Sequence, residues 1–205
     1  DEEYWDYEYI DESAASVTQI ITEFYINFKN ELVMSSNCAT ALYTGLITDS
    51  GNFSYDKVNK KTFLCASELI EYIDLNFIKQ SLSKESIQLL RLKGYCLSNF
   101  CIHNHFAYIK LDKNIMNEFN VSEEEAASLV NIISGLDSVL VWAMFLETAD
   151  EIRVRLRSKG PIINILANKY NGGGHALTSG AKLKSFDEID KFVRDVDELI
   201  CEFKN

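Results

Sequence analysis

A ten-residue run in the second half of the chain, Glu151–Gly160, fixes one element of the fold. Apolar residues alternate there with arginines, in the order Ile152, Arg153, Val154, Arg155, Leu156 and Arg157. Because successive side chains of a strand point to opposite faces, this alternation predicts a β-strand with one face in a core and one cationic face. This part of the chain therefore belongs to a sheet.

The cationic face of that strand needs negative partners. Three guanidinium groups on one face repel each other unless anions lie over them. For Arg153 and Arg155 those anions are either carboxylates of the chain itself or a ligand, and both interpretations stay open. Arg157 differs, because it ends the strand beside Ser158, where a loop could hold a phosphate.

A glycine run follows within Tyr170–Gly180, where Gly172, Gly173 and Gly174 precede His175. Each glycine costs roughly 1 kcal/mol in a regular element, so three together indicate a close approach to the backbone or a positive φ. A histidine beside bare N–H groups suits a phosphate or a similar anion. The competing interpretation is a helix that ends before the run, with Gly172 as its left-handed cap, which accounts for only one or two of the glycines.

Composition narrows the classes of function. The chain has 205 residues, of which 47% are hydrophobic and 25% charged, enough for one large globular domain or two small ones. Its formal net charge of −11 argues against a broad track for long DNA or RNA, but it is compatible with a small anionic substrate held by a few local cations. No stretch approaches the ~20 apolar residues of a membrane span.

The cysteines and the first residues indicate the compartment. An odd number of scattered cysteines suggests reduced thiols in a cytoplasmic protein. They are Cys38, Cys65, Cys96, Cys101 and Cys201. The start, Asp1–Asp6, is acidic and aromatic without an initiator methionine, so we expect no signal peptide there and interpret it as a cut inside a longer protein.

Helical periodicity dominates the first part of the chain. Residues 13–28 predict an amphipathic helix whose apolar stripe faces a core. The stripe consists of Val17, Ile20, Ile21, Phe24 and Phe28. A second, shorter helix from about Asn37 is expected to break at Gly45. We expect this helical part to cover residues 1–80, followed by a connecting helix over 81–100.

The pattern changes to strands after residue 100. Phe106–Leu111 predicts a strand, Ser138–Glu147 predicts a strand buried on both faces, and a clean apolar stripe from Ile189 predicts a last helix that covers the sheet. We therefore expect an α/β fold, with a small α/β domain and a mixed sheet over residues 101–205.

Two further groups of residues have the chemistry of metal ligands. Asp49 follows an apolar pair and precedes Gly51, so it is a metal ligand, a general base or an Asx turn, of which the turn is favoured. Four soft ligands within ten residues suggest zinc, but their spacing is not of the CxxC type, so core thiols beside exposed or satisfied histidines are favoured. These four are Cys96, Cys101, His103 and His105.

Separated stretches together resemble one family. Three short stretches of the second half resemble the DHH-associated C-terminal domain of DHH-family phosphoesterases. They are Arg157–Gly160, Gly172–His175 and Ser179-Gly180. Ala39–Phe53 is similar to the last metal-ligand motif of the DHH domain itself, and Ile10–Ser16 resembles the segment after the Asp-His-His signature. The matches occur in the family's order and span the whole chain. Within the family, the sequence around Asp49 looks most like that of the bifunctional oligoribonuclease and 3′-phosphoadenosine-5′-phosphate phosphatase group.

The resemblance implies roles for particular residues. Asp49 would be one carboxylate ligand of a pair of manganese ions, which generate hydroxide and stabilise the oxygens at phosphorus. Arg157 and Ser158 would bind a phosphate or a base edge, since a guanidinium fork can hold two phosphate oxygens. The remaining implied substrate-binding residues are Gly172, Gly173, Gly174, His175 and Ser179. His175 would also be the catalytic residue of this part of the chain.

The chain departs from the family pattern in one large respect. The Asp-His-His signature and the earlier aspartates of the metal site are absent from these 205 residues. Asp49 alone should not hold a metal pair, because divalent ions need several ligands. After His175 the residues Ala176-Leu177 also stand where many relatives have a polar residue, which leaves the preferred base or chain length open.

These expectations lead to three functions. The first is a manganese-dependent phosphoesterase that releases AMP from very short RNA or from 3′-phosphoadenosine 5′-phosphate, for which this chain alone is incomplete. The second is a nucleotide- or RNA-binding module without catalysis, and the third is a cyclic-dinucleotide phosphodiesterase. Short RNA or a small adenine nucleotide is the expected partner, and a homodimer is left open.

Overall fold

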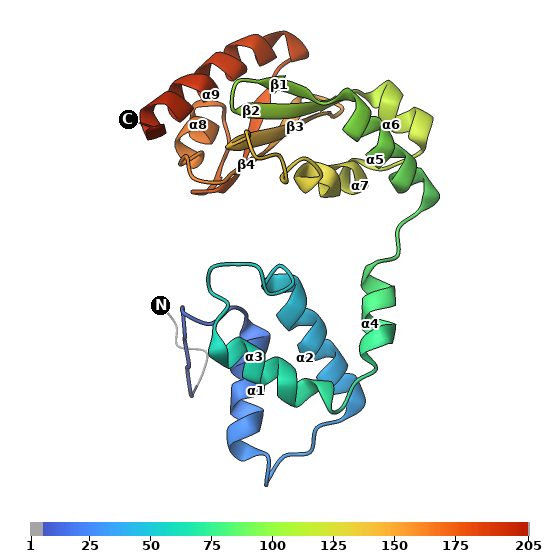
Figure 1. Cartoon of the computed structure of the whole chain (residues 1–205), viewed down its shortest axis with the longest axis vertical. Coiled ribbons are helices and arrows are strands. Elements are labelled where there is room, and N and C mark those ends of the chain that lie inside the picture. The colour runs from blue at the N-terminus through green and yellow to red at the C-terminus, as the bar shows by residue number, and fades with distance from the viewer. Residues whose placement is uncertain (1–5, 205) are drawn as a thin grey trace. The chain divides into compact units, whose positions relative to one another are not determined.

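The computed structural model describes residues 6–204 and divides the chain into two compact units, Asp1–Lys84 and Glu85–Asn205 (Figure 1). The division lies inside the segment 81–100. Most of the acidic start, residues 1–5, lies outside the described residues. None of the helices within residues 6–204 combines the length and the apolarity needed to cross a membrane.

Within residues 6–84, the first unit has four helices around one core. They are α1 (Val17–Phe28), α2 (Ser36–Asp49), α3 (Lys60–Ile70) and α4 (Leu75–Leu82). Each begins at a polar side chain that accepts a hydrogen bond from a first-turn N–H, as N-cap residues do. These caps are Ser16, Ser35, Asn59 and Asp74. The core is centred on Ala39, Leu46, Cys65 and Leu69.

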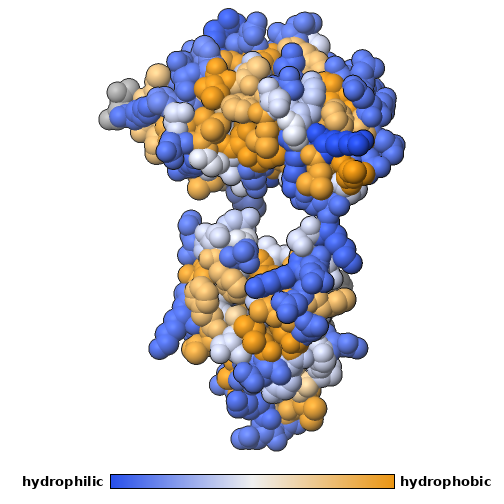
Figure 2. Space-filling view, turned by 45° about the vertical axis from the view of Figure 1, so that its right-hand side comes forward, coloured by the Kyte–Doolittle hydropathy of each residue, from blue (hydrophilic) through white to orange (hydrophobic). Residues whose placement is uncertain are grey.

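The prediction of which face of α1 is buried is wrong. Four residues of the predicted stripe are exposed, namely Val17, Ile21, Phe24 and Phe28. The buried side chains of the helix are Gln19, Thr22 and Tyr25. A polar face can be buried here because its groups are satisfied: the Gln19 side-chain oxygen accepts from the hydroxyl of Thr62 at 2.9 Å. Figure 2 shows apolar patches at the surface of this unit.

The helix break expected at Gly45 is also wrong. Helix α2 continues through Gly45 to Asp49. A Cβ on Gly45 would stand 2.5 Å from Cγ2 of Thr18, beside the start of α1. The glycine therefore serves the close approach of two helices rather than the end of one.

The second unit contains a six-stranded mixed sheet, which confirms the predicted α/β class. Its strands are β1 (Cys101–His103), β2 (Phe106–Leu111), β3 (Val141–Glu147), β4 (Ile152–Ser158), β5 (Gly173–His175) and β6 (Thr178–Leu183). The spatial order is β1-β2-β3-β4-β6-β5. Strands β2 and β3 run parallel, and every other neighbouring pair runs antiparallel. The burial of β3 on both faces and the alternation of β4 are as predicted.

Helices cover the two faces of this sheet unequally. They are α5 (Ile87–Asn99), α6 (Lys113–Phe119), α7 (Glu123–Ser128), α8 (Asn164–Lys169) and α9 (Ile189–Lys204), with short 3₁₀ turns η1 (Leu129–Asn131) and η2 (Phe186–Glu188). Residues of α8 and α9 pack on one face, against strands β2, β3, β4 and β6. Residues of α5, α6, α7 and η1 pack on the other face, where the buried strand residues all come from β2 and β3 among those described. On that second face, β4, β5 and β6 are left with their polar side chains.

Candidate functional site

Strand pairing places three polar side chains in one row on this second face. Arg157 lies opposite Trp142 on one side and Thr178 on the other, and Thr178 lies opposite His175. Directly opposed residues project from the same face with Cβ atoms about 4.5–5.5 Å apart. Arg157, Thr178 and His175 are therefore neighbours, and we call them the Arg157 row. The structure brings together two of the predicted site residues, Arg157 and His175.

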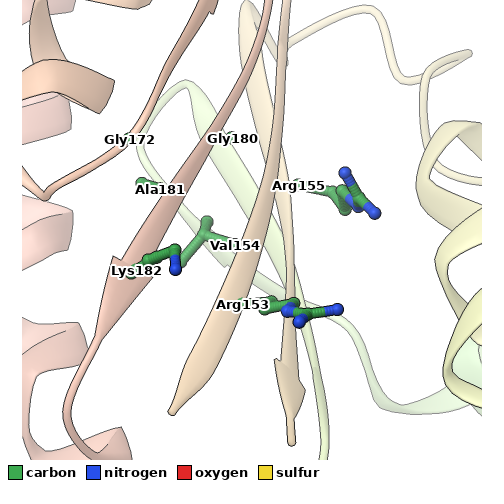
Figure 3. A pocket seen from close by; sticks show the side chains of 7 residues that line it. All are labelled: Arg153, Val154, Arg155, Gly172, Gly180, Ala181 and Lys182. Carbon is green, nitrogen blue, oxygen red and sulfur yellow. The ribbon is translucent and has the colours of Figure 1, made fainter.

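The next two rows carry the other arginines of β4. Arg155 lies opposite Gly180, and Gly173 lies opposite Gly180 one strand further along the same row. Beyond them, Arg153 lies opposite Lys182. Figure 3 shows Arg153 and Arg155 extending from the same side of β4. The face thus has cations around a strip that carries no side chains.

The electrostatic partners of these cations differ. Arg153 lies 3.6 Å from Glu123 and 3.6 Å from Glu151, and the Nζ of Lys182 lies 3.1 Å from Glu151. Within residues 6–204, Arg155 has no ion-pair partner within 4.0 Å. The two arginines therefore differ. The chain's own carboxylates neutralise Arg153, and Arg155 is left available for a ligand.

A pocket of about 280 Å³ lies at these rows (Figure 3). It is lined by Arg153, Val154, Arg155, Gly172, Gly180, Ala181 and Lys182. The pocket thus combines three cationic side chains with the backbone of two glycines. Such a lining suits an anion, because guanidinium and ammonium groups donate hydrogen bonds to oxyanions and the glycines leave room for a ligand beside them.

The three consecutive glycines have different reasons to be glycine. A Cβ on Gly172 would stand 1.9 Å from the carbonyl oxygen of Gly180. Gly174 has a φ of +137°, and a Cβ there would stand 2.7 Å from the carbonyl oxygen of Thr178. For Gly173 the nearest atom is the side-chain oxygen of Asn168 at 3.4 Å, an ordinary contact. Gly173 is thus the one glycine of the run whose bare backbone is not explained by the packing of the described chain.

The cap interpretation of the run is wrong in its detail. The left-handed residue after α8 is Asn171, with a φ of 52°, and not Gly172. The run itself continues as strand β5 from Gly173 and pairs with β6. Its backbone is consequently held in a sheet edge rather than in a loop.

Two predicted site residues, Ser158 and Ser179, point away from the Arg157 row. In the strand register Ser158 shares a face with Val141, and Ser179 with Leu156, so both lie on the α8 and α9 side. The Ser158 Oγ accepts from the N–H of Gly160 at 3.0 Å. The Ser179 Oγ donates to the carbonyl oxygen of His175 at 2.8 Å. Their hydroxyls therefore hold the backbone beside the row.

Sequence reasoning missed Thr178 and Gly180 as members of this face, and it placed Arg155 there without counting it among the site residues. A signal was present, because Ala181 and Leu183 are the apolar positions of the last strand. Strict alternation from them places Ser179 inward and Thr178 outward. The same rule applied to β4 places Ser158 inward.

A buried tyrosine anchors the start of the glycine run. The Tyr170 hydroxyl donates to the Asp195 carboxylate of α9 at 2.5 Å, and the Nζ of Lys169 lies 2.9 Å from the same carboxylate. Burial and the hydrogen bond to Asp195 raise the pKa of Tyr170. The backbone on either side is also tied: the Gly172 N–H donates to the Ala167 carbonyl at 2.9 Å.

Asp49 belongs to the first unit and ends α2 with an exposed side chain. The turn after it is made by Ser50, whose Oγ accepts from the N–H of Phe53 at 3.1 Å, so the favoured Asx turn is not what the structure shows. Gly51, Asn52 and Phe53 all have positive φ angles. A carboxylate at the C-terminal end of a helix is disfavoured by the helix dipole. Local folding therefore gives no reason for an aspartate at this position.

The described residues do not assemble a metal centre. Within residues 6–204 there is no group of three or more His, Cys, Asp or Glu side chains placed to hold an ion. The manganese pair implied by the resemblance thus has one implied ligand in this chain, Asp49, and these residues alone do not fit it. Of the four soft ligands, His103 pairs with Asp197 at 2.8 Å, and Nδ1 of His105 lies 2.7 Å from the carbonyl oxygen of Ser138. Burial raises the pKa of the Cys96 thiol to about 11.

The second unit is thus a mixed α/β domain that presents cations beside a bare glycine edge. Residues 103–202 match the DHHA1 domain family. This match covers most of the second unit, so that unit is similar to DHHA1 domains.

Comparison with known proteins gives three informative similarities. The chain is 35% identical over 202 residues to the bifunctional oligoribonuclease and PAP phosphatase NrnA of Bacillus subtilis, covering 97% of this chain and 64% of that protein. It is 24% identical over 178 residues to the cyclic-di-AMP phosphodiesterase GdpP of Geobacillus thermodenitrificans, covering 85% of this chain and 26% of that protein. Among solved structures, an exopolyphosphatase-related protein from Bacteroides fragilis matches with a TM-score of 0.81 and 26% identity, over 97% of this chain and 62% of that one. The chain thus spans somewhat less than two thirds of the Bacillus relative.

Proposed function

We propose that this chain is the substrate-binding portion of a phosphoesterase that hydrolyses short oligoribonucleotides or 3′-phosphoadenosine 5′-phosphate and releases AMP-type mononucleotides. The observation that carries the proposal is the Arg157 row. It places a guanidinium, a hydroxyl and an imidazole side by side on the open face of a DHHA1 domain. The printed name of the Bacillus relative supports the substrate class.

The row is suited to a phosphate group. The Arg157 fork can bind two oxygens of one phosphate, and the hydroxyl of Thr178 can donate to a third. His175, the proposed catalytic residue, can donate to the phosphate or exchange a proton with it. The bare backbone of Gly173 lets a ligand approach the edge strand beside this imidazole.

Asp49 is the proposed metal ligand of the first unit, and two manganese ions are the proposed cofactor of the complete protein. The support for this role is its residue type and its position, where neither a turn nor a helix end explains a carboxylate. The cytoplasm is the proposed compartment. None of the five cysteines forms a disulfide in the described part of the chain.

The test is AMP release by the complete gene product in the presence of Mn²⁺, with a ribodinucleotide and 3′-phosphoadenosine 5′-phosphate as substrates. Asp49→Asn should lower the rate by more than about a hundredfold, because loss of one ligand carboxylate disrupts a metal site. Asp56→Asn is the matched control, since Asp56 is an exposed acid of the following loop. Full activity of Asp49→Asn would contradict the proposed role.

A second candidate, a cyclic-dinucleotide phosphodiesterase, is favoured by the similarity to the Geobacillus protein. The same preparation separates the two functions. Faster turnover of a cyclic dinucleotide than of the linear substrates would select the second one. A complete protein that binds AMP but hydrolyses none of these substrates would instead be a binding module without catalysis. The lack of a group of three or more metal-ligand side chains within residues 6–204 favours that function.

A further inference from the structure

We propose that Arg155, with Gly180 beside it and Gly173 beyond Gly180 in the same row, forms a second phosphate position next to the Arg157 row. This position would hold the second phosphate of a ribodinucleotide or a slightly longer chain. The inference rests on the proposed function, because it extends the same binding face. It identifies the residues that would distinguish an oligonucleotide from a mononucleotide.

The first support is the shape of the strip. Gly173 and Gly180 are directly opposed to each other in the β5–β6 ladder, and Gly180 is directly opposed to Arg155. A Cβ on Gly180 would have the carbonyl oxygen of Val154 as its nearest atom, at 3.4 Å, and neither glycine has a positive φ. The described chain would therefore accept an alanine at both positions. Their lack of side chains instead keeps the floor of this strip open.

The second support is charge. Arg155 is exposed at the pocket and has no ion pair in the described part of the chain, whereas Arg153 and Lys182 share the carboxylate of Glu151. An unneutralised guanidinium is notable in a chain with a net charge of −11. A phosphate suits it, because the fork of Arg155 can make two parallel charge-assisted hydrogen bonds to phosphate oxygens.

The third support is the position of Arg155 relative to the Arg157 row. Alternate residues on one face of a strand are about 6.7 Å apart, so the two arginines emerge from adjacent rows. On β6, Gly180 is two residues after Thr178, so both lie on the same face of the strand, opposite Arg155 and Arg157. A ligand that places one phosphate at Arg157 can therefore run along β4 and β6 to Arg155 without crossing a side chain at position 180.

The experiment measures the binding of AMP and of the 5′-phosphorylated dinucleotide pApA to the 205-residue chain by calorimetry, without metal. The wild-type chain should bind pApA more tightly than AMP. Arg155→Gln should weaken pApA by about tenfold or more, since a charge-assisted hydrogen-bonded contact is lost, and should leave AMP within about twofold. The slope of log K against log salt for pApA should fall by about 0.7.

Two further variants separate the position from general charge and from folding. Gly180→Ala should reduce pApA binding selectively with an unchanged melting temperature, because the added methyl group occupies the floor. Arg153→Gln removes the same charge from the neighbouring row and should have the smaller effect, since Arg153 is already paired with Glu123 and Glu151.

The outcomes distinguish this inference from the proposed function. If the wild-type chain binds AMP, and Arg155→Gln changes neither ligand, or both equally, the second position is contradicted and the proposed function stands. Equal effects of Arg153→Gln and Arg155→Gln would also overturn the position. If the wild-type chain binds neither AMP nor pApA at millimolar concentration, the proposed binding face itself is contradicted, and the second position with it.

Discussion

Gly172 lies so close to Gly180 that a Cβ on Gly172 would stand 1.9 Å from the Gly180 carbonyl oxygen. Movement at this contact would disturb the β5–β6 edge and also the end of α8, because the Gly172 N–H donates to the carbonyl oxygen of Ala167. We predict that Gly172→Ala lowers the free energy of unfolding by at least about 1–3 kcal/mol, the usual cost of overpacking. Urea titration of the second unit's unfolding transition measures it.

Gly173→Ala is the matched control for that variant. Its Cβ would find an ordinary contact at 3.4 Å and no left-handed backbone. The unfolding free energy should therefore stay the same or rise by about 0.4–1 kcal/mol, as alanine restricts the unfolded chain. Affinity for the dinucleotide pApA should nevertheless fall, because Gly173 lies opposite Gly180 in the row of Arg155. Equal destabilisation by both variants would contradict the different reasons assigned to the two glycines.

Tyr170→Phe removes the hydroxyl that joins the glycine run to α9. Burial by itself would raise the pKa of the Asp195 carboxyl, but the hydrogen bonds from Tyr170 and Lys169 hold that pKa below its usual value. We expect a loss of about 0.5–1.5 kcal/mol of unfolding free energy and weaker AMP binding, since the segment before β5 loses its anchor. Thermal melts and calorimetry measure the two effects. Unchanged AMP affinity at reduced stability would limit Tyr170 to a folding role.

Much of the second unit was predictable from residues alone. The alternation in β4 fixed its two faces, and the continuous apolar run fixed β3, because in both cases the pattern has a single structural solution. The motif alone did not show on which side of the sheet Ser158 and Ser179 lie, although the alternation of apolar residues along β4 and β6 places both inward. The strand register was needed to show which residues of β4, β5 and β6 stand opposite one another.

The first unit was harder because periodicity detects a stripe without saying what packs against it. The buried face of α1 is polar and owes its burial to a partner far along the chain, Thr62, which no local pattern shows. Gly45 was misinterpreted for the same reason, since its cause is Thr18 on another helix. Asp49 was singled out from its residue type, but its neighbours are ordinary turn residues that favoured an Asx turn, and only the resemblance favoured a metal ligand.

The exposure of the predicted apolar stripe of α1 can be tested by two substitutions, one in the stripe and one in the core of the first unit. Leu46 is fully buried in the core of the first unit, whereas Phe24 is 57% exposed. Leu46→Ala should cost about 2–5 kcal/mol of unfolding free energy, and Phe24→Ala should cost well under half as much. Urea unfolding of the 205-residue chain compares them. A larger loss for Phe24→Ala would show that the predicted stripe faces a core after all.

Two buried thiols predict a loss of stability at alkaline pH. Burial raises the pKa of Cys65 and of Cys96 to about 11, from an ordinary value of 9.0. The unfolded chain therefore ionises first, so the stability contributed by the neutral thiols is complete below about pH 9 and is lost as the pH rises towards 11. Unfolding midpoints measured across this range should fall, and the Cys65→Ala, Cys96→Ala double variant should show a shallower decline. An equal decline in both chains would assign the effect to other groups.

The proposed function requires that the open face of β4, β5 and β6 binds the phosphate of a nucleotide. The most direct measurement is an NMR titration of the ¹⁵N-labelled chain with AMP. We predict that the largest amide shift changes occur at Gly173, His175 and Thr178 and at the end of β4, and that His175→Ala abolishes them. Shift changes confined to the α8 and α9 side of the sheet, or no changes at millimolar AMP, would contradict it.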